Sequence, residues 1–592
     1  MLVLPYGISD FYQIRTQHYR YLDRTHYLPI LEQAGKQLVF LRPRRFGKSL
    51  LISMLEHYYD LNKAEQFALL FGDLNIGQHP TTEHNQYLIL RWDFSMVSAI
   101  GDIEHIKHSL FTHINLAIKD FARQYQNLLQ GQIDIIPDAL GSFQSLVDIV
   151  SASHQQLYLL IDEYDNFANE VLISAVQGEQ RYRDLLSGEG IVKTLFKIIK
   201  GSASEGKIAR VFITGVSPIV LADMTSGYNV AVNIALHEEL NSLCGITEVE
   251  LIELLTEVVD GCQSNGSVSY LLDTMRQFYN GYRFCHDLKE PTVYNPTLCF
   301  YFLNYYQRRC ETPLQLLDGN LAMDASRIRY IANLPLGHQV ISQILDEQNP
   351  PTLTFLENQF GVEHLHKLQQ LPSYMLSLMY YFGVLTIVGQ GELEDIVLGV
   401  PNRVIYRLYV EELKEQLLPL GDQPHITQLA RQFYQTAHLS PLADALEAKY
   451  FAVFDNRDYR WSNELTIKTA FMTLLFNDAY YIMDSEASVQ RRYTDLVMII
   501  RPSMRKHQTL KDFVLEFKYL KLGDLGLNAE AVRAQSREEL LQLPLVQEHL
   551  KHALDQLGAY RTTLNNRYQQ PERLYCIAII ALGFERLVWQ VL

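Results

Sequence analysis

The stretch Leu38-Val-Phe-Leu-Arg-Pro-Arg-Arg-Phe-Gly-Lys-Ser-Leu50 decides how the first half of this chain folds. Its first four residues are apolar and predict a short buried strand, and the helix-periodic run that begins at Leu50 predicts a helix. Between them lies a tight loop that ends in Gly47, Lys48 and Ser49. Strand, loop, Gly-Lys-Ser and helix, in this order, form the context that a phosphate-binding loop requires.

In such a loop, backbone N–H groups and the helix N-terminus hold the phosphates of a nucleotide. The Lys48 ammonium reaches the β- and γ-phosphates, and the Ser49 hydroxyl ligates Mg²⁺. We therefore expect ATP and Mg²⁺ as cofactors. The expected nucleotide-binding residues of this loop are Arg42, Pro43, Arg44, Arg45, Phe46, Gly47, Lys48, Ser49 and Leu50.

One residue departs from the usual loop pattern. Arg42 stands where that pattern has its first glycine, and a β-carbon at this turn narrows the allowed backbone. Arg42, Arg44 and Arg45 suit anions but crowd the loop. The alternative interpretation is a glycine at a helix start followed by an ordinary surface lysine. We disfavour it because a second motif supports the first.

The second motif is Leu157-Tyr-Leu-Leu-Ile-Asp-Glu-Tyr-Asp165, an apolar strand that ends in Asp162 and Glu163. In phosphate-loop NTPases, the Asp at such a strand end orients Mg²⁺ through water, and the following Glu polarises the attacking water as general base. An Asp-Glu pair after an apolar run is common by chance, but here it follows Gly-Lys-Ser in the expected order. Asp162 is therefore a candidate metal and nucleotide residue, and Glu163 a candidate catalytic base.

Together with Tyr21-Leu-Asp-Arg-Thr25, these two motifs resemble those of a known family, the bacterial AAA-ATPase-like proteins that end in a PD-(D/E)xK nuclease-like domain. Arg in place of the first loop glycine belongs to that family's pattern. The resemblance extends over nearly the whole chain. Further matching segments are Thr214-Gly-Val-Ser-Pro218, Tyr279-Asn-Gly-Tyr-Arg-Phe284, Tyr294-Asn-Pro296 and Pro401-Asn402.

The resemblance implies roles for residues outside the two motifs. The segment that begins at Tyr21 is expected at the base side of the nucleotide, although Asp23 itself favours a capping role. A polar residue after the Asp-Glu strand positions the attacking water in AAA-type ATPases, and Thr214 or Ser217 fits that place. A strand-end Thr that merely caps the next turn is an equal alternative.

Length and composition describe a globular chain of several domains. The 592 residues are 48% hydrophobic and 20% charged, and domains average ~150 residues. The net charge of −16 gives no global attraction for nucleic acid, so binding needs a local basic surface or a partner. The scattered six Cys argue against a zinc site or a disulfide framework. With neither an apolar run of ~18 residues nor a signal peptide, we expect a cytoplasmic protein without membrane contact.

Periodicity divides the chain into four parts. Strands alternating with helices over 1–240 predict an AAA-like P-loop ATPase core, with a parallel sheet covered on both faces. Residues 241–303 are expected to form a helical lid, in which Thr247 and Glu250 predict a capping box. Residues 304–440 predict a helical and mixed connector, with a winged-helix-like module as the alternative. Residues 441–592 predict a mixed α/β domain of the PD-(D/E)xK type.

The second chemical site lies in the last part. Glu516 and Lys518 are two apart in an apolar strand, so both project to the same face. Asp495 begins the preceding strand, predicted over 491–500, and the hairpin 501–511 brings it alongside. Two carboxylates and the Phe517 carbonyl suit Mg²⁺, and Lys518 suits orienting or deprotonating the attacking water.

The PD-(D/E)xK resemblance adds two helical residues to this site. Glu464 fits the acidic ligand that such folds take from the preceding helix. Gln556, with Tyr560 four residues on, matches a Gln-xxx-Tyr pair placed beside the metal. The resulting candidate set is catalytic Asp495, Glu516, Lys518 and Gln556, with Glu464, Asp495 and Glu516 as metal ligands.

Three functions are compatible with this sequence. The first is an ATPase that gates a Mg²⁺-dependent nuclease acting on DNA or RNA, with DNA preferred. The second is an ATP-dependent switch or scaffold whose nuclease-like domain binds nucleic acid or protein without cutting. The third is a transposon-derived or defence element that needs a partner, either a protein or further copies of the chain. The expected backbone-binding cations are Arg491, Arg492, Arg501, Arg505, Lys506 and Lys511.

Overall fold

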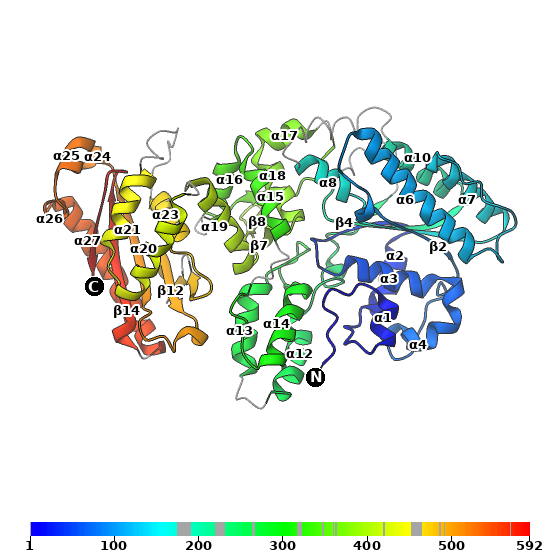
Figure 1. Cartoon of the computed structure of the whole chain (residues 1–592), viewed down its shortest axis with the longest axis horizontal. Coiled ribbons are helices and arrows are strands. Elements are labelled where there is room, and N and C mark those ends of the chain that lie inside the picture. The colour runs from blue at the N-terminus through cyan, green and yellow to red at the C-terminus, as the bar shows by residue number, and fades with distance from the viewer. Residues whose placement is uncertain are drawn as a thin grey trace. The chain divides into compact units, whose positions relative to one another are not determined.

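The computed structural model forms two compact units (Figure 1). Unit 1 comprises Met1–Pro313, Leu317–Ile344 and Pro350–Ile405, and unit 2 comprises Leu314–Leu316, Leu345–Asn349 and Tyr406–Leu592. The structure describes residues 2–173, 191–219, 231–262, 267–316, 322–345, 349–358, 360–361, 364–417, 421–451, 464–484, 487–489, 492–568 and 570–592. The finer division at 240, 303 and 440 stays a prediction.

Unit 1 is built on a parallel sheet of order β2-β3-β4-β1-β5. Its strands are β1 (Gln37–Leu41), β2 (Leu88–Asp93), β3 (Leu157–Asp162), β4 (Ile208–Gly215) and β5 (Val232–Asn233). The apolar runs that predicted β1 and β3 are buried, because helices cover both faces of the sheet. The predicted fold class is confirmed.

The helices on one face include those that follow the phosphate loop (Figure 1). This face carries α1 (Phe11–Thr16) and α2 (Leu28–Ala34), which precede the loop, and α3 (Lys48–Tyr59) and α4 (Phe67–Phe71), which follow it. The other face carries α6 (Ile103–Gln124), α7 (Ala139–Ala152) and α10 (Ile191–Ser204) (Figure 1). The Asp102 side chain caps the first turn of α6.

The predicted lid contains α12 (Glu248–Asp260), α13 (Val268–Tyr279) and α14 (Pro296–Arg309). The capping box of Thr247 and Glu250 is confirmed at the N-terminus of α12. The inference against disulfides is wrong at one place, because Cys262 and Cys310 form a disulfide across these helices. Their separation of 48 residues hides the pairing from any local pattern.

The remainder of unit 1 is helical with a small antiparallel sheet. The sheet contains the antiparallel hairpin of β7 (Thr386–Gln390) and β8 (Ile396–Gly399), and β6 (Thr352–Leu353) pairs with β8. The helices here are α15 (Ala322–Ala332), α16 (Gly337–Ile344), α17 (Leu365–Gln370) and α18 (Pro372–Tyr381). Helix α19 (Arg403–Leu417) continues the chain from unit 1 into unit 2.

Unit 2 is built on a mixed sheet of order β15-β14-β13-β12-β9, in which β13 and β14 are parallel and the other neighbours antiparallel. Its strands are β9 (Tyr481–Asp484), β12 (Leu496–Ile500), β13 (Asp512–Leu520), β14 (Leu574–Leu582) and β15 (Arg586–Val591). Its helices include α20 (Gln423–Thr436), α21 (Ser440–Ala445), α23 (Glu464–Leu475), α24 (Leu522–Leu525), α25 (Ala529–Ala534), α26 (Arg537–Leu541) and α27 (Pro544–Tyr568).

The strand predicted over 491–500 is divided in the structure. Residue 491 lies outside the described residues, β11 (Arg492–Thr494) pairs with β10 (Ala487–Val489), and β12 begins only at Leu496. Asp495 separates the two strands, and its Oδ2 accepts the Phe517 N–H at 2.7 Å. The Phe517 N–H of β13 therefore bonds to the Asp495 side chain and not to a backbone carbonyl, and the ladder between β12 and β13 ends at the pair Leu496 and Leu515.

Along the part of the chain that the structure describes, no helix combines the length and apolarity needed to cross a bilayer.

Candidate active sites

The phosphate-loop motif lies where β1 turns into α3. Gly47 caps α3 with φ of +95°, a left-handed conformation that favours glycine. Lys48 begins the helix and is only 3% exposed. Its Nζ donates to the carbonyls of Arg42 at 3.0 Å and Pro43 at 3.1 Å, so the ammonium lies over its own loop.

Arg42 does not face an anion site as its place in the loop suggested. Its side chain is buried, and the guanidinium donates to the carbonyls of Leu41, Ala235 and Leu240 at 2.7–2.8 Å. The guanidinium carbon lies 4.4 Å from the ring centre of Phe40 and 4.2 Å from that of Phe284. Burial lowers the pKa of Arg42 to about 10. Arg42 therefore fastens β1 to the segment 235–240.

The two other loop arginines have different surroundings. Arg44 donates to the Asn166 side chain and lies 3.8 Å from the Glu170 carboxylate, both on α8 (Asn166–Ile173). Arg45 has a φ of +67°, and its carbonyl accepts from the Thr297 hydroxyl at 3.2 Å. Arg44 is thereby directed toward the chain that follows the Asp-Glu motif.

The Asp-Glu motif ends β3 beside β4. Asp162 is fully buried, and its Oδ1 accepts from the Thr214 hydroxyl at 2.5 Å. Its Oδ2 is also buried and has no hydrogen-bond partner among the described residues. Glu163 follows in a left-handed conformation with φ of +51°. Burial raises the pKa of Glu163, although the charges of Lys48 and Arg44 lower it.

The structure separates the two residues that the sequence left as alternatives. Thr214 bonds to Asp162, whereas the Ser217 N–H and hydroxyl both donate to Asp165 at 2.8 Å. Asp165 also accepts from the Asn169 side chain at 2.5 Å and from the Val216 N–H at 3.0 Å. Sequence reasoning missed Asp165 as the residue that fixes the turn after β4. The available signal was its position in the Asp-Glu-Tyr-Asp run.

The predicted second site comes together in unit 2. Glu516 and Lys518 share one face of β13, and the Lys518 Nζ lies 3.1 Å from Glu516 Oε1 and 3.1 Å from Glu464 Oε1. Glu464 is the first residue of α23. Asp495, the residue before β12, accepts a hydrogen bond from the backbone N–H of Phe517, between Glu516 and Lys518. Glu516 and Asp495 are 3% and 7% exposed, so the site has little water to disperse their charges.

These groups shift one another's pKa values. Burial, followed by the charge of Asp495, raises the pKa of Glu516 to about 7 despite the opposing effect of Lys518. Burial also raises the pKa of Glu464. Burial alone would lower the pKa of Lys518, but the charges of Glu516, Glu464 and Asp495 outweigh it and raise the pKa. The Lys518 ammonium thus lies beside Glu516 and Glu464, whose raised pKa values favour the protonated carboxyls.

Helix α27 packs on the same side of β13. Val514 and Leu520, which share a face with Glu516 and Lys518, belong to a core cluster that also contains Leu557 and Tyr560 of α27. Gln556 directly precedes Leu557, and its Oε1 is buried without a hydrogen-bond partner in the described parts of the chain. The structure thus places Gln556 and Tyr560 on a helix that covers this face.

Both candidate sites contain carboxylates, the type of ligand that divalent cations such as Mg²⁺ prefer. Within the described residues, no group of three His, Cys, Asp or Glu side chains is arranged to hold one. Glu516 Oε2, like Asp162 Oδ2, is nevertheless a buried carboxylate oxygen to which no described residue donates a hydrogen bond. Mg²⁺ prefers carboxylate oxygens, so the chemistry of each donor set fits the ion, although the described side chains are not gathered around one point.

Two of the predicted nucleic-acid-binding cations are used inside unit 2. Arg501 is 4% exposed and donates to the carbonyls of Leu314 and Asp478 at 2.8 and 3.1 Å. Arg505 pairs with the buried Asp512 at 3.1 Å. The prediction that Arg501 belongs to an exposed backbone-binding surface is wrong, because its side chain is buried; Arg505 is half-buried, and its guanidinium is used in the pair with Asp512. Arg491 and the Arg492 side chain lie outside the described residues.

Comparison with known proteins locates similarity at both ends of the chain. Residues 5–225 match a family model described as predicted AAA-ATPase, and residues 462–590 match the PD-(D/E)XK nuclease superfamily. A curated relative, "Uncharacterized protein in vnfD 5'region" of Azotobacter chroococcum mcd 1, is 26% identical over 321 residues. The match covers 53% of this chain and 54% of that protein, about half the length of each.

Two solved structures were also matched. The Aeropyrum pernix ORC1 protein in complex with DNA has 13% identity and a TM-score of 0.27, over 67% of this chain and 96% of that one. Cdc6p from Pyrobaculum aerophilum has 10% identity and a TM-score of 0.23, over 68% and 98%. The chain thus carries an AAA-ATPase-like domain over residues 5–225 and a PD-(D/E)XK nuclease-superfamily domain over residues 462–590, each containing one of the two candidate sites.

Proposed function

We propose that this protein is an ATPase whose nucleotide state controls a Mg²⁺-dependent nuclease on the same chain. The observation that carries the proposal is the gathering of Glu464, Asp495, Glu516 and Lys518 around one edge of β13. Such a group of charges, in which burial and the charge of Asp495 raise the pKa of Glu516 to about 7, is expected at a catalytic site rather than in a sheet core.

At the first site, Lys48 would exchange its two backbone carbonyls for nucleotide phosphates. Ser49 and Asp162 would hold Mg²⁺, which supplies charge neutralisation at the phosphates. Thr214 fixes Asp162 through one carboxylate oxygen and leaves the other available. Glu163, whose pKa is raised by burial, is better matched to accept a proton from water than an exposed Glu is.

At the second site, Asp495, Glu516 and Glu464 would hold the metal ion, which supplies Lewis-acid stabilisation of the phosphodiester. Lys518 has a raised pKa and stays protonated at neutral pH. Its expected role is therefore to orient the attacking water through hydrogen-bond donation, rather than to remove the proton of that water. Gln556, on the helix that covers the same face, would position the water or a phosphate oxygen.

The second candidate function is a switch or scaffold that binds nucleic acid or protein without cutting. It is favoured by the two ion pairs of Lys518, which compensate the carboxylates inside the protein. The internal use of Arg501 and Arg505 also removes part of the expected cationic surface. Under either function, the proposed partner is nucleic acid, DNA before RNA, with a homo-oligomer or a protein partner as a further proposal.

A cleavage assay separates the two functions. Single- and double-stranded DNA and RNA are incubated with the parent, Asp495→Ala and Lys518→Ala, with Mg²⁺ or Mn²⁺ and with or without ATP. The nuclease proposal expects cleavage by the parent only. Asp495→Ala should lose metal binding, and Lys518→Ala should keep it. A parent that cuts no substrate under any nucleotide condition would favour the scaffold.

The nucleotide site is tested by calorimetry. Lys48→Ala is expected to abolish ATP binding, because the loop loses its only buried ammonium among the described residues that line it. The matched control is Lys63→Ala, which removes a lysine in the 3-10 helix Leu61–Gln66 that follows α3. Equal ATP affinity in Lys48→Ala and parent would remove the nucleotide assignment.

A further inference from the structure

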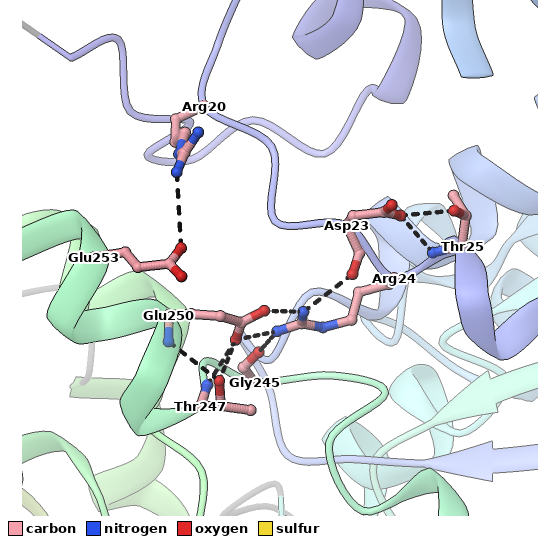
Figure 2. A network of polar contacts seen from close by, with 8 residues as sticks. All are labelled: Arg20, Asp23, Arg24, Thr25, Gly245, Thr247, Glu250 and Glu253. Atoms are coloured by element: carbon pink, nitrogen blue, oxygen red, sulfur yellow. Dashed lines mark hydrogen bonds and ion pairs between the residues drawn. The ribbon is translucent and has the colours of Figure 1, made fainter. Parts of the chain in front are cut away.

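A polar network joins the N-terminal segment of unit 1 to the first turn of α12 (Figure 2). Arg24 donates to both carboxylate oxygens of Glu250, one of them at 2.8 Å, and to the Gly245 carbonyl at 2.7 Å. We name Arg24, Gly245 and Glu250 the Arg24 clamp. Its two sides are more than 220 residues apart in sequence, so it closes a long loop of chain.

The lid side of the clamp is rigid. Glu250 Oε2 also accepts from the Thr247 N–H and hydroxyl at 2.8 Å, so one carboxylate caps α12 and receives Arg24. The Arg24 charge lowers the pKa of Glu250 against the effect of its burial, which keeps the carboxylate ionised. Gly245 admits no side chain, since a Cβ there would lie 2.8 Å from Val293.

The N-terminal side is fixed as well. Asp23 accepts from the Thr25 N–H at 2.8 Å and the Thr25 hydroxyl at 2.7 Å, and from the Asn75 N–H at 2.7 Å. Arg20 adds a contact with α12 through Glu257 at 2.9 Å and Glu253 at 4.0 Å. These last pairs are exposed and contribute little. Arg24 is thus the main polar link between two anchored segments.

A cavity of about 80 Å³ lies beside the clamp. Its lining includes Arg24 and Gly245 from the clamp and Gly47 and Leu50 from the phosphate loop and α3. Because residues from both sides of the clamp line this cavity, a nucleotide held next to Gly47 would lie between the lid and the N-terminal segment. Its entry and release would then require these two segments to separate.

We propose that Arg24 is a positioning residue that holds the lid against the N-terminal segment beside the phosphate loop and thereby sets the rate of nucleotide exchange. The inference rests on the proposed ATP site at Lys48. Breaking the clamp leaves the phosphate loop intact and lowers the barrier to lid opening. Exchange of a nucleotide should then accelerate, whereas a ligand made of phosphates alone should be unaffected.

The test measures dissociation of a fluorescent ATP analogue by stopped flow, and binding of inorganic tripolyphosphate by calorimetry. Arg24→Gln should release the analogue about 10-fold faster, within the range of coupling between sites. Its tripolyphosphate affinity should stay within about twofold of the parent. The release rate of Arg24→Lys should lie between those of the parent and Arg24→Gln, because lysine keeps the positive charge but lacks the planar guanidinium that can donate to both carboxylate oxygens.

The matched control is Arg276→Gln. Arg276 makes a similar two-point ion pair with Glu248 of α12, at 2.9 and 3.0 Å, but connects α12 to α13 within the lid. Its exchange rate should equal that of the parent. An Arg24→Gln rate equal to the parent, or a parallel loss of tripolyphosphate binding, would overturn the inference. If Lys48→Ala binds ATP normally, the proposed function fails first.

Discussion

Replacing Lys518 by Met tests how the buried charges of unit 2 are balanced. Lys518 lies 3.1 Å from both Glu464 and Glu516, and its side chain is only 16% exposed. Removing one partner of a buried ion pair costs ~3–5 kcal/mol when the remaining group stays ionised. Here the Glu516 carboxylate can become neutral by binding a proton, so the loss of stability depends on pH.

The size of the effect follows from linkage. The pKa of Glu516 is about 7 in the folded protein, and its ordinary value, which applies to the unfolded chain, is 4.5. Between these values the folded state binds more protons than the unfolded chain, so the free energy of unfolding falls as pH rises, in parent and variant alike. Above pH 7 Glu516 of the parent is ionised in both the folded and the unfolded state, so the free energy of unfolding no longer falls. Without Lys518 the carboxyl stays protonated, and the variant continues to lose ~1.4 kcal/mol per pH unit.

We therefore expect the stability deficit of Lys518→Met to exceed its value at pH 6 by ~1.4 kcal/mol at pH 8 and by up to ~3 kcal/mol at pH 9. Native-state hydrogen exchange of β13 amides, in EDTA and corrected for intrinsic rates, measures this difference. Lys449→Met is the control, because its pair with Asp422 is partly exposed, with side chains 38% and 30% accessible, and should cost less than ~1 kcal/mol at every pH. A loss that is equal at pH 6 and pH 9 would refute the charge balance described here.

Three further outcomes are expected. Glu163→Gln should bind ATP as the parent does but release no phosphate, because only the general base is lost; turnover at the parent rate would exclude Glu163 as the base. Arg42→Met should destabilise unit 1 by ~3 kcal/mol or more, since three buried carbonyls each lose a donor worth ~1–3 kcal/mol, and exchange of the amides in 235–240 reports it. An Arg42→Met protein of parent stability with weakened ATP binding would instead place the guanidinium on phosphate. Finally, nucleic-acid affinity measured by fluorescence anisotropy should differ ~5–150-fold between ATP and ADP, and equal affinities would mean that the two domains are only tethered.

Local sequence was sufficient to predict the main elements around both candidate sites and to name their candidate residues. Gly47, Lys48 and Ser49 are recognisable because a phosphate loop depends on residues within one turn of each other. Glu516 and Lys518 share a face because the side-chain period of a strand is two, whatever the strand pairs with. The capping box of α12 is local in the same way, and the structure confirms it.

Only the tertiary structure decided which partner each charged side chain meets. Arg42 and Arg501 have the character of anion binders in the sequence, but both donate to backbone carbonyls, some of them nearly 200 residues away. Thr214 and Ser217 are equivalent by position, and the register of β3 against β4 assigns Thr214 to Asp162. The physical reason is common to all of them: a buried polar group must be satisfied by whatever the fold brings within ~3 Å, and sequence spacing does not encode that neighbour.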